Sequence, residues 1–172
     1  MKMRGFEDST SHPQILASSN PQILTMKVFL GGTAGHSTWR KDIAIPILEA
    51  AGVSYFNPQL GVGEWTPAHQ KIEADAKAKA EVWLFVVSSE TRGVASLVEA
   101  AYRVGTGGKL ALVVQKIEED DLFDGLPLGE LERKDLNRGR SYLIEVAEQN
   151  GLPVFEDVAE ATRYAIKLKM EN

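Results

Sequence analysis

Two glutamates in this sequence have the chemistry to act together on a glycosidic bond. Glu73 and Glu99 lie in two predicted helices that follow one another along the chain. If the carboxylates converge, one can attack an anomeric carbon through an oxocarbenium-like transition state while the other handles the proton of the leaving group. Each glutamate also has an ordinary alternative, because Glu73 with Lys77 and Glu99 with Arg103 are spaced i, i+4 as solvated ion pairs on a helix.

A glycine-rich turn follows the first predicted strand. The stretch VFLGGTAG at 28–35 runs from three apolar residues into Gly31 and Gly32, after which Ser37 or Thr38 is placed to cap a helix. Its spacing differs from the G-x-G-x-x-G of dinucleotide-binding proteins, no G-K-[ST] follows to make a P-loop, and the paired acids of a phospho-acceptor receiver are missing. Small residues, hydroxyls and backbone amides at helix N-termini instead suit an anion or a sugar.

Composition limits the classes of partner. The 172 residues have a formal net charge of −5, which disfavours a nucleic-acid polymer because phosphate-backbone binding draws on clustered Lys and Arg. No apolar stretch approaches the ~20 residues that span a membrane. Cysteine is absent, which excludes disulfides and thiolate metal sites and fits a cytoplasmic location. The three histidines lack metal-ligand spacing, so we expect neither a metal nor another cofactor.

Alternating strands and helices follow Met26. Five βα units predict an α/β fold in which helices cover both faces of a parallel sheet. The expected strands are 27–31, 53–56, 82–87, 109–114 and 153–155, and the expected helices are 38–51, 67–80, 92–104, 136–149 and 157–169. We therefore expect a flavodoxin-like three-layer sandwich with a five-stranded parallel sheet in the order 2-1-3-4-5.

Three segments stand apart from this regular pattern. Residues 1–25 are polar and predict an N-terminal extension ahead of a single domain over residues 26–172. Pro46 falls inside the first expected helix, where it should kink or restart the axis. The acidic stretch 116–135 predicts a long loop before the fourth helix.

The predicted topology gathers the carboxyl ends of the strands at one crevice. The residues expected there are Gly31, Gly32, Thr33, Asn57, Ser88, Ser89 and Gln115. Any one of them is explained by turning the chain or capping a helix, but together they favour a ligand site. Glu99 can point toward the mouth of this crevice, because helical side chains lean toward the N-terminus of their helix.

Taken in order, these pieces resemble the nucleoside 2-deoxyribosyltransferase-like family, which includes nucleoside deoxyribosyltransferases and 5′-nucleotide N-glycosidases. The matching motifs are VFLGGT at 28–33, Trp39, Asn57-Pro58, Trp65, Gln70 with Glu73, AEVWLFVVSSET at 80–91 and LVEAAY at 97–102. The resemblance implies that Glu99 is the nucleophile that takes the deoxyribosyl group and that Glu73 contacts or protonates the base. It also implies that Gln70 helps to read the base, and that the sugar or a 5′-phosphate is held by Gly31, Gly32, Ser88 and Ser89.

Two positions depart from the family pattern. Phe29 stands where a tyrosine often orients the nucleophile, and Arg92-Gly93 replaces a second acid that reads the base. The alternative is therefore a nucleotide-binding or sensing domain without turnover, with an oligomeric scaffold as a third hypothesis.

Relatives complete their sites across subunit contacts, so the resemblance implies at least a homodimer. Arg138 and Arg140 are either a fork for a 5′-phosphate or a solvated helix start.

Overall fold

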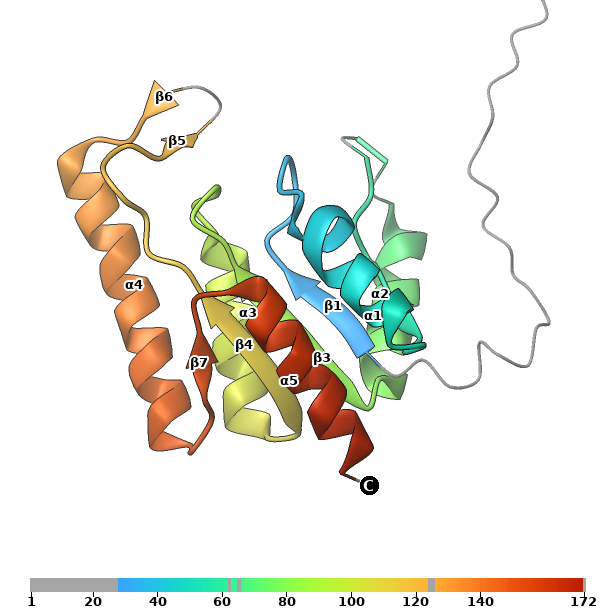
Figure 1. Cartoon of the computed structure of the whole chain (residues 1–172). Coiled ribbons are helices and arrows are strands. Elements are labelled where there is room, and N and C mark those ends of the chain that lie inside the picture. The colour runs from blue at the N-terminus through green and yellow to red at the C-terminus, as the bar shows by residue number, and fades with distance from the viewer. Residues whose placement is uncertain (1–27, 62, 65, 124–125, 172) are drawn as a thin grey trace, which may run out of the picture.

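The structure, a computed structural model, describes residues 28–61, 63–64, 66–123 and 126–171. The predicted extension over residues 1–25 and Trp65 lie outside the described residues. A five-stranded parallel sheet forms the centre, in the order β2-β1-β3-β4-β7 (Figure 1). Its strands are β1 (Val28–Gly32), β2 (Tyr55–Phe56), β3 (Val82–Val87), β4 (Lys109–Val114) and β7 (Val154–Phe155). Because β7 is the fifth strand of this sheet along the chain, the predicted order is confirmed.

Helices cover both faces of the sheet, as predicted. Figure 1 shows α5 (Val158–Met170) crossing in front of the sheet and α3 (Val94–Thr106) behind it. One buried core joins α1 (Ile45–Ala50) and α5 to the sheet, and a second core joins α2 (Pro67–Lys79), α3 and α4 (Glu130–Gln149) to the other face. The three-layer α/β sandwich is thus confirmed.

The sequence of the central strand β3 does not alternate between apolar and polar residues, and its position in the sheet explains why. All six of its residues are buried. Val82, Leu84 and Val86 belong to one core, whereas Trp83, Phe85 and Val87 belong to the other. Successive side chains of a strand point to opposite faces, so a strand covered on both faces is apolar throughout.

The first expected helix is divided at its proline. A π-helical segment, Arg40–Ala44, leads directly into α1, and the Ile45 N–H donates to the Arg40 carbonyl. Pro46 has no N–H to donate, and its ring would meet the carbonyl four residues earlier in a regular α-helix. A wider turn just before the proline avoids this clash. The predicted disturbance at Pro46 is thus a change from π-helical to α-helical turns, and the helix does not restart there.

The prediction of a continuous loop over residues 116–135 is wrong. Leu122–Phe123 (β5) and Leu126–Pro127 (β6) pair as a short antiparallel ladder, and α4 begins at Glu130 rather than at residue 136. Glu130 and Glu132 occupy the first turn of α4, where negative side chains interact favourably with the helix dipole. Some of the acidic residues that suggested a solvated loop therefore belong to the first turn of a helix.

Candidate active site

Helices α2 and α3 bring Glu73 and Glu99 to one ammonium group. Lys77 Nζ lies 2.7 Å from Glu73 Oε1, one helical turn away, and also contacts Glu99 Oε1 on the neighbouring helix. The side chains are 23% exposed for Lys77, 32% for Glu73 and 33% for Glu99. The expected alternative of a Glu99–Arg103 pair is wrong, because Glu99 binds Lys77 and the Arg103 guanidinium lies 4.4 Å from the centre of the Trp83 ring.

Two aromatic rings pack against the ion triad of Lys77, Glu73 and Glu99. Lys77 Nζ is 5.3 Å from the centre of the Phe29 ring and 6.0 Å from that of Trp83. The two rings pack against each other with centres 5.2 Å apart, and Trp83 Nε1 donates to the Lys77 carbonyl at 3.2 Å. An ammonium over an aromatic face is held by the ring quadrupole. The Lys77 ammonium is therefore held by two aromatic rings and by two carboxylates.

The Lys77 ammonium experiences opposing effects. Burial alone lowers the pKa of Lys77, but its hydrogen bonds and charge interactions with Glu73 and Glu99 outweigh burial and raise that pKa above its ordinary value. The lysine is therefore charged at neutral pH, and this one cation serves both carboxyl groups.

Glu73 and Glu99 also line a cavity of about 230 Å³ at the carboxyl end of β1. The loop after β1 and the loop after β2 form the other walls. The remaining lining residues are Gly32, Ala34, Arg40, Pro58, Gln59, Leu60 and Gly61. An adjoining recess of about 50 Å³ shares Glu73 and adds Asn57 and His69.

Arg40 places a second fixed cation in the wall of this cavity. Arg40 as a whole is 1% exposed, and its guanidinium donates to the carbonyls of Leu30 at 3.0 Å, Gly32 at 3.2 Å and Thr33 at 2.6 Å. Burial lowers the pKa of Arg40 to about 10 against the opposing charge of Glu73, so the group stays protonated at neutral pH. Arg40 is not among the predicted site residues, and the only signal for it in the sequence is its place just after the glycine-rich turn.

Four of the predicted ligand residues lie at the ends of β1 and β3. Thr33 and Ser88 are buried, and their hydroxyl oxygens are 3.0 Å apart. A side chain at Gly31 would meet the Phe85 ring, and one at Gly32 would meet the Val86 carbonyl oxygen at 2.0 Å. Of these four, only Gly32 lines the cavity with Glu99. The expectation that Thr33 and Ser88 border the same pocket as Glu99 is wrong, because the two hydroxyls bind each other across the strand ends.

The remaining predicted residues, Asn57, Gln70 and Ser89, lie outside the cavity that Glu99 lines. Asn57 lines the small recess, where its side-chain oxygen accepts from the Gln59 N–H at 3.0 Å. Gln70 is exposed on α2, one turn before Glu73. Ser89 lies elsewhere, beside Gln115 in a cavity of about 500 Å³, and its N–H donates to Gln115 Oε1 at 3.3 Å.

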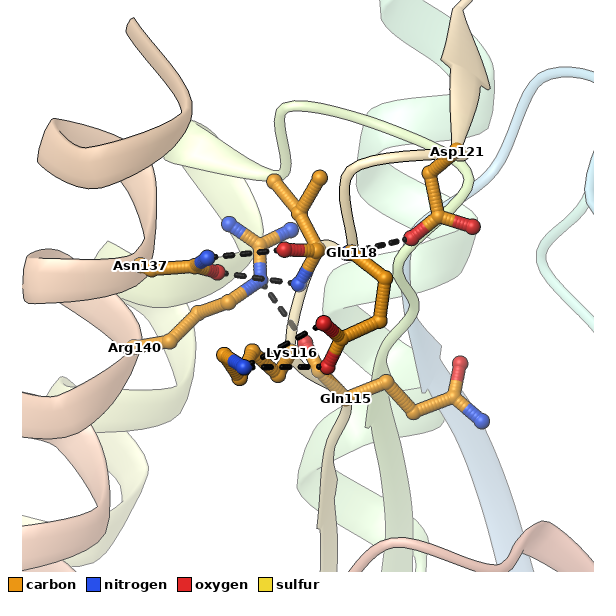
Figure 2. A network of polar contacts seen from close by, with 7 residues as sticks. Gln115, Lys116, Glu118, Asp121, Asn137 and Arg140 are labelled. Carbon is orange, nitrogen blue, oxygen red and sulfur yellow. Dashed lines mark hydrogen bonds and ion pairs between the residues drawn. The ribbon is translucent and has the colours of Figure 1, made fainter. Parts of the chain in front are cut away.

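Arg140 is structural, so both alternatives expected for it, a phosphate fork and a solvated helix start, are wrong. It is buried in the middle of α4, and its five N–H groups have carbonyl partners. The acceptors are the carbonyls of Ser88, Thr91, Arg92, Gln115 and Leu136. Figure 2 shows Arg140 and Asn137 reaching from α4 to the chain that follows β4, where Asn137 binds both the N–H and the carbonyl of Ile117. The neighbouring Arg138 is exposed and pairs with Asp135.

A larger cavity lies on the other side of the loop after β1. It measures about 480 Å³ and includes His36, Glu90, Arg92 and Phe123 in its lining. Arg92, one of the departures from the family pattern, is bound to Glu132 at 2.6 Å and lies 5.7 Å from the centre of the Phe123 ring. Within the described part of the chain, no group of three or more His, Cys, Asp or Glu side chains could hold a metal ion.

The fold and the cavity define an α/β protein with paired carboxylates at the carboxyl edge of a parallel sheet. The sequence model of the nucleoside 2-deoxyribosyltransferase-like family matches residues 25–117, and the chain belongs to this family. The match spans β1 to β4 and includes both Glu73 and Glu99. No curated protein and no solved structure matches the chain significantly. The family is generally enzymatic, and it points to small-molecule nucleosides as ligands.

Proposed function

We propose that the protein cleaves or exchanges the N-glycosidic bond of a 2′-deoxynucleoside or its 5′-monophosphate, with retention of configuration and Glu99 as the nucleophile. The observation that carries this proposal is that Glu73 and Glu99 face one cavity and share one ammonium. Two carboxylate oxygens on a single nitrogen lie within about 5 Å of each other, which suits a retaining mechanism. Membership of the family supports a nucleoside as the substrate.

The reaction proceeds in two displacements at the anomeric carbon. A Glu99 oxygen bonds to C1′ as the C1′–N bond breaks, and the base leaves with the bonding electrons and takes up a proton. Water or a second base then attacks C1′ and releases the Glu99 carboxylate. Glu73 contacts or protonates the base, and Gln70, on the same helix, helps to read it.

The other predicted residues are proposed to shape the site. Gly32 and Asn57 contact substrate from the walls of the two adjoining cavities. Gly31, Thr33 and Ser88 are buried, so they set the position of the strand ends instead. Ser89 reaches only a ligand that extends to the cavity beside Gln115.

A sensing domain without turnover is the second candidate function. One observation favours it: Phe29 stands where the family often has a tyrosine that orients the nucleophile, and its ring has no hydroxyl to do so. A sensor binds nucleotides in this cavity and never releases base, which separates the two functions directly.

A chromatographic screen of deoxynucleosides and their monophosphates for released base tests the proposal. With an active substrate, Glu99→Gln should lower turnover at least ~10³-fold, or ~4 kcal/mol of barrier, while binding changes little, because the amide keeps the shape but cannot attack C1′. Glu148→Gln, an exposed glutamate on α4, is the matched control. Base release by Glu99→Gln at the wild-type rate would contradict the assignment.

We also propose a homodimer or a higher homo-oligomer in the cytoplasm. The apolar outer face of α3 supports self-association, because Val94, Val98 and Tyr102 are all more than half exposed. The absence of cysteine supports the location. No helix within the described ranges is long and apolar enough to cross a membrane.

A further inference from the structure

The strongest unexplained feature of the cavity is Lys77. Two carboxylates at close range repel each other, and the repulsion favours a proton on one of them. A protonated glutamate cannot attack carbon, so a site of this kind needs a cation that keeps both groups ionised. Lys77 contacts both carboxylates from the last turns of α2.

The surroundings of Lys77 hold its ammonium in one place. Its Nζ lies over the Phe29 and Trp83 rings, and its own carbonyl accepts from Trp83 Nε1. Two other cations face the same region: Arg103 stacks on Trp83, and Arg40 lies in the cavity wall within range of the Glu73 charge. Arg40 is occupied by three backbone carbonyls. Lys77 is therefore the cation that contacts both carboxylates.

We propose that Lys77 is the positioning residue of this cavity, and that its ammonium holds the carboxylates of Glu73 and Glu99 together and ionised. The inference rests on the proposed function for its kinetic consequence, because it states how the nucleophile is kept ready. When Glu99 bonds to C1′ its negative charge is lost, and Lys77 stays paired with Glu73 alone. With Glu73 ionised, its role toward the base is contact, and the departing base takes its proton from solvent.

Kinetics of Lys77→Met, Lys77→Arg and Lys79→Met test the proposal on an active substrate. Lys79 is exposed on the same helix and controls for the loss of one charge. Lys77→Met should lower kcat about 100-fold with little change in KM, because the nucleophile is misplaced. It should also move the acid limb of the kcat profile to higher pH, because Glu73 and Glu99 then compete for a proton. Lys77→Arg should restore part of kcat, and Lys79→Met should behave as wild type. Wild-type kcat and an unmoved acid limb in Lys77→Met would overturn the proposal.

A second measurement is independent of turnover. The Lys77 side chain can be titrated by NMR in the wild type, Glu73→Gln and Glu99→Gln. Each substitution should lower the pKa of Lys77, because each removes one of the two partners that raise it. An unchanged Lys77 titration in both variants overturns the proposal even if the enzyme is active. The expected titration in a protein that releases base from no substrate supports the positioning role and overturns the proposed turnover.

Discussion

At Lys77 the balance between burial and charge has a consequence for stability. The pKa of this lysine is raised above its ordinary value of 10.5, since the two glutamates outweigh the effect of burial. A group whose pKa is higher in the folded than in the unfolded protein stabilises the fold below the unfolded value. That contribution disappears as the pH rises through the folded value.

The pH dependence of unfolding tests this balance. The free energy of unfolding should be about 1 kcal/mol lower in Lys77→Met than in the wild type at neutral pH, because two carboxylates lose their shared partner. The difference should shrink as the pH rises from about 10.5, where the lysine of the unfolded chain deprotonates, through the higher pKa of the folded protein. Urea titrations from pH 7 upward measure it, with Lys79→Met as the control. A difference that stays constant across this range contradicts the account.

Single residues show how far a sequence predicts a site. Helical spacing indicated Glu73 and Glu99, because residue type and register suffice to place a side chain on a helix face. Glu99 pairs with Lys77 rather than with Arg103 because of the way α2 packs beside α3. Residue spacing within one helix carries no information about that packing. Burial of Arg40 and Arg140 was missed, since their partners are backbone carbonyls, which no residue type marks; those of Arg40 lie in and just after β1, and most of those of Arg140 are distant in sequence.

The end of β1 depends on a glycine for steric reasons. Gly32 has a φ of 107°, and a Cβ there would lie 2.0 Å from the Val86 carbonyl oxygen. Gly32→Ala should therefore cost about 3 kcal/mol of unfolding free energy or more, combining backbone strain with a backbone clash. Gly35→Ala is the matched control, because Gly35 also has a positive φ but a Cβ there would meet no atom within 4 Å. Its cost should be about 1 kcal/mol, and equal losses in the two variants would refute the steric argument.

Arg140 ties α4 to the loop between β3 and α3. Arg140→Met should lower the free energy of unfolding by about 3 kcal/mol, because several buried carbonyls lose their donor. Arg138→Met, which removes an exposed charge two residues away, should change it by less than about 0.5 kcal/mol. Urea unfolding compares the two variants. A loss in Arg138→Met as large as that in Arg140→Met would show that α4 is not held to this loop by Arg140.

The elements themselves were more predictable than their ends. Alternation of apolar runs with amphipathic segments is a local pattern, so the five strands and their order followed from it. The start of α4 was misplaced because Glu130 and Glu132 satisfy either a solvated loop or a helix N-terminus. Residues 130–132 are exposed in the helix, so a burial pattern in the sequence does not distinguish these alternatives.

The helical layer formed by α2, α3 and α4 has an exposed apolar surface on its outer side. On α3, Glu99 turns toward the cavity, while Val98 is 69% exposed on the outer side. A shallow apolar groove of about 230 Å³ continues this surface onto α4, where it includes Tyr142 and Val146. An amphipathic helix normally buries its apolar stripe, so this face is the one we expect to meet a second copy of the chain.

Sedimentation of Val98→Lys tests self-association through that face. A charge at the centre of an apolar interface has to be desolvated, so the variant should dimerise about 100-fold more weakly than the wild type. Met170→Lys is the control, because Met170 is 75% exposed at the end of α5, on the opposite face of the sheet. The control should sediment as the wild type does, and both variants should unfold at the wild-type denaturant concentration. A wild type that is monomeric at every concentration, or equal dimerisation by Val98→Lys, would contradict the proposed interface.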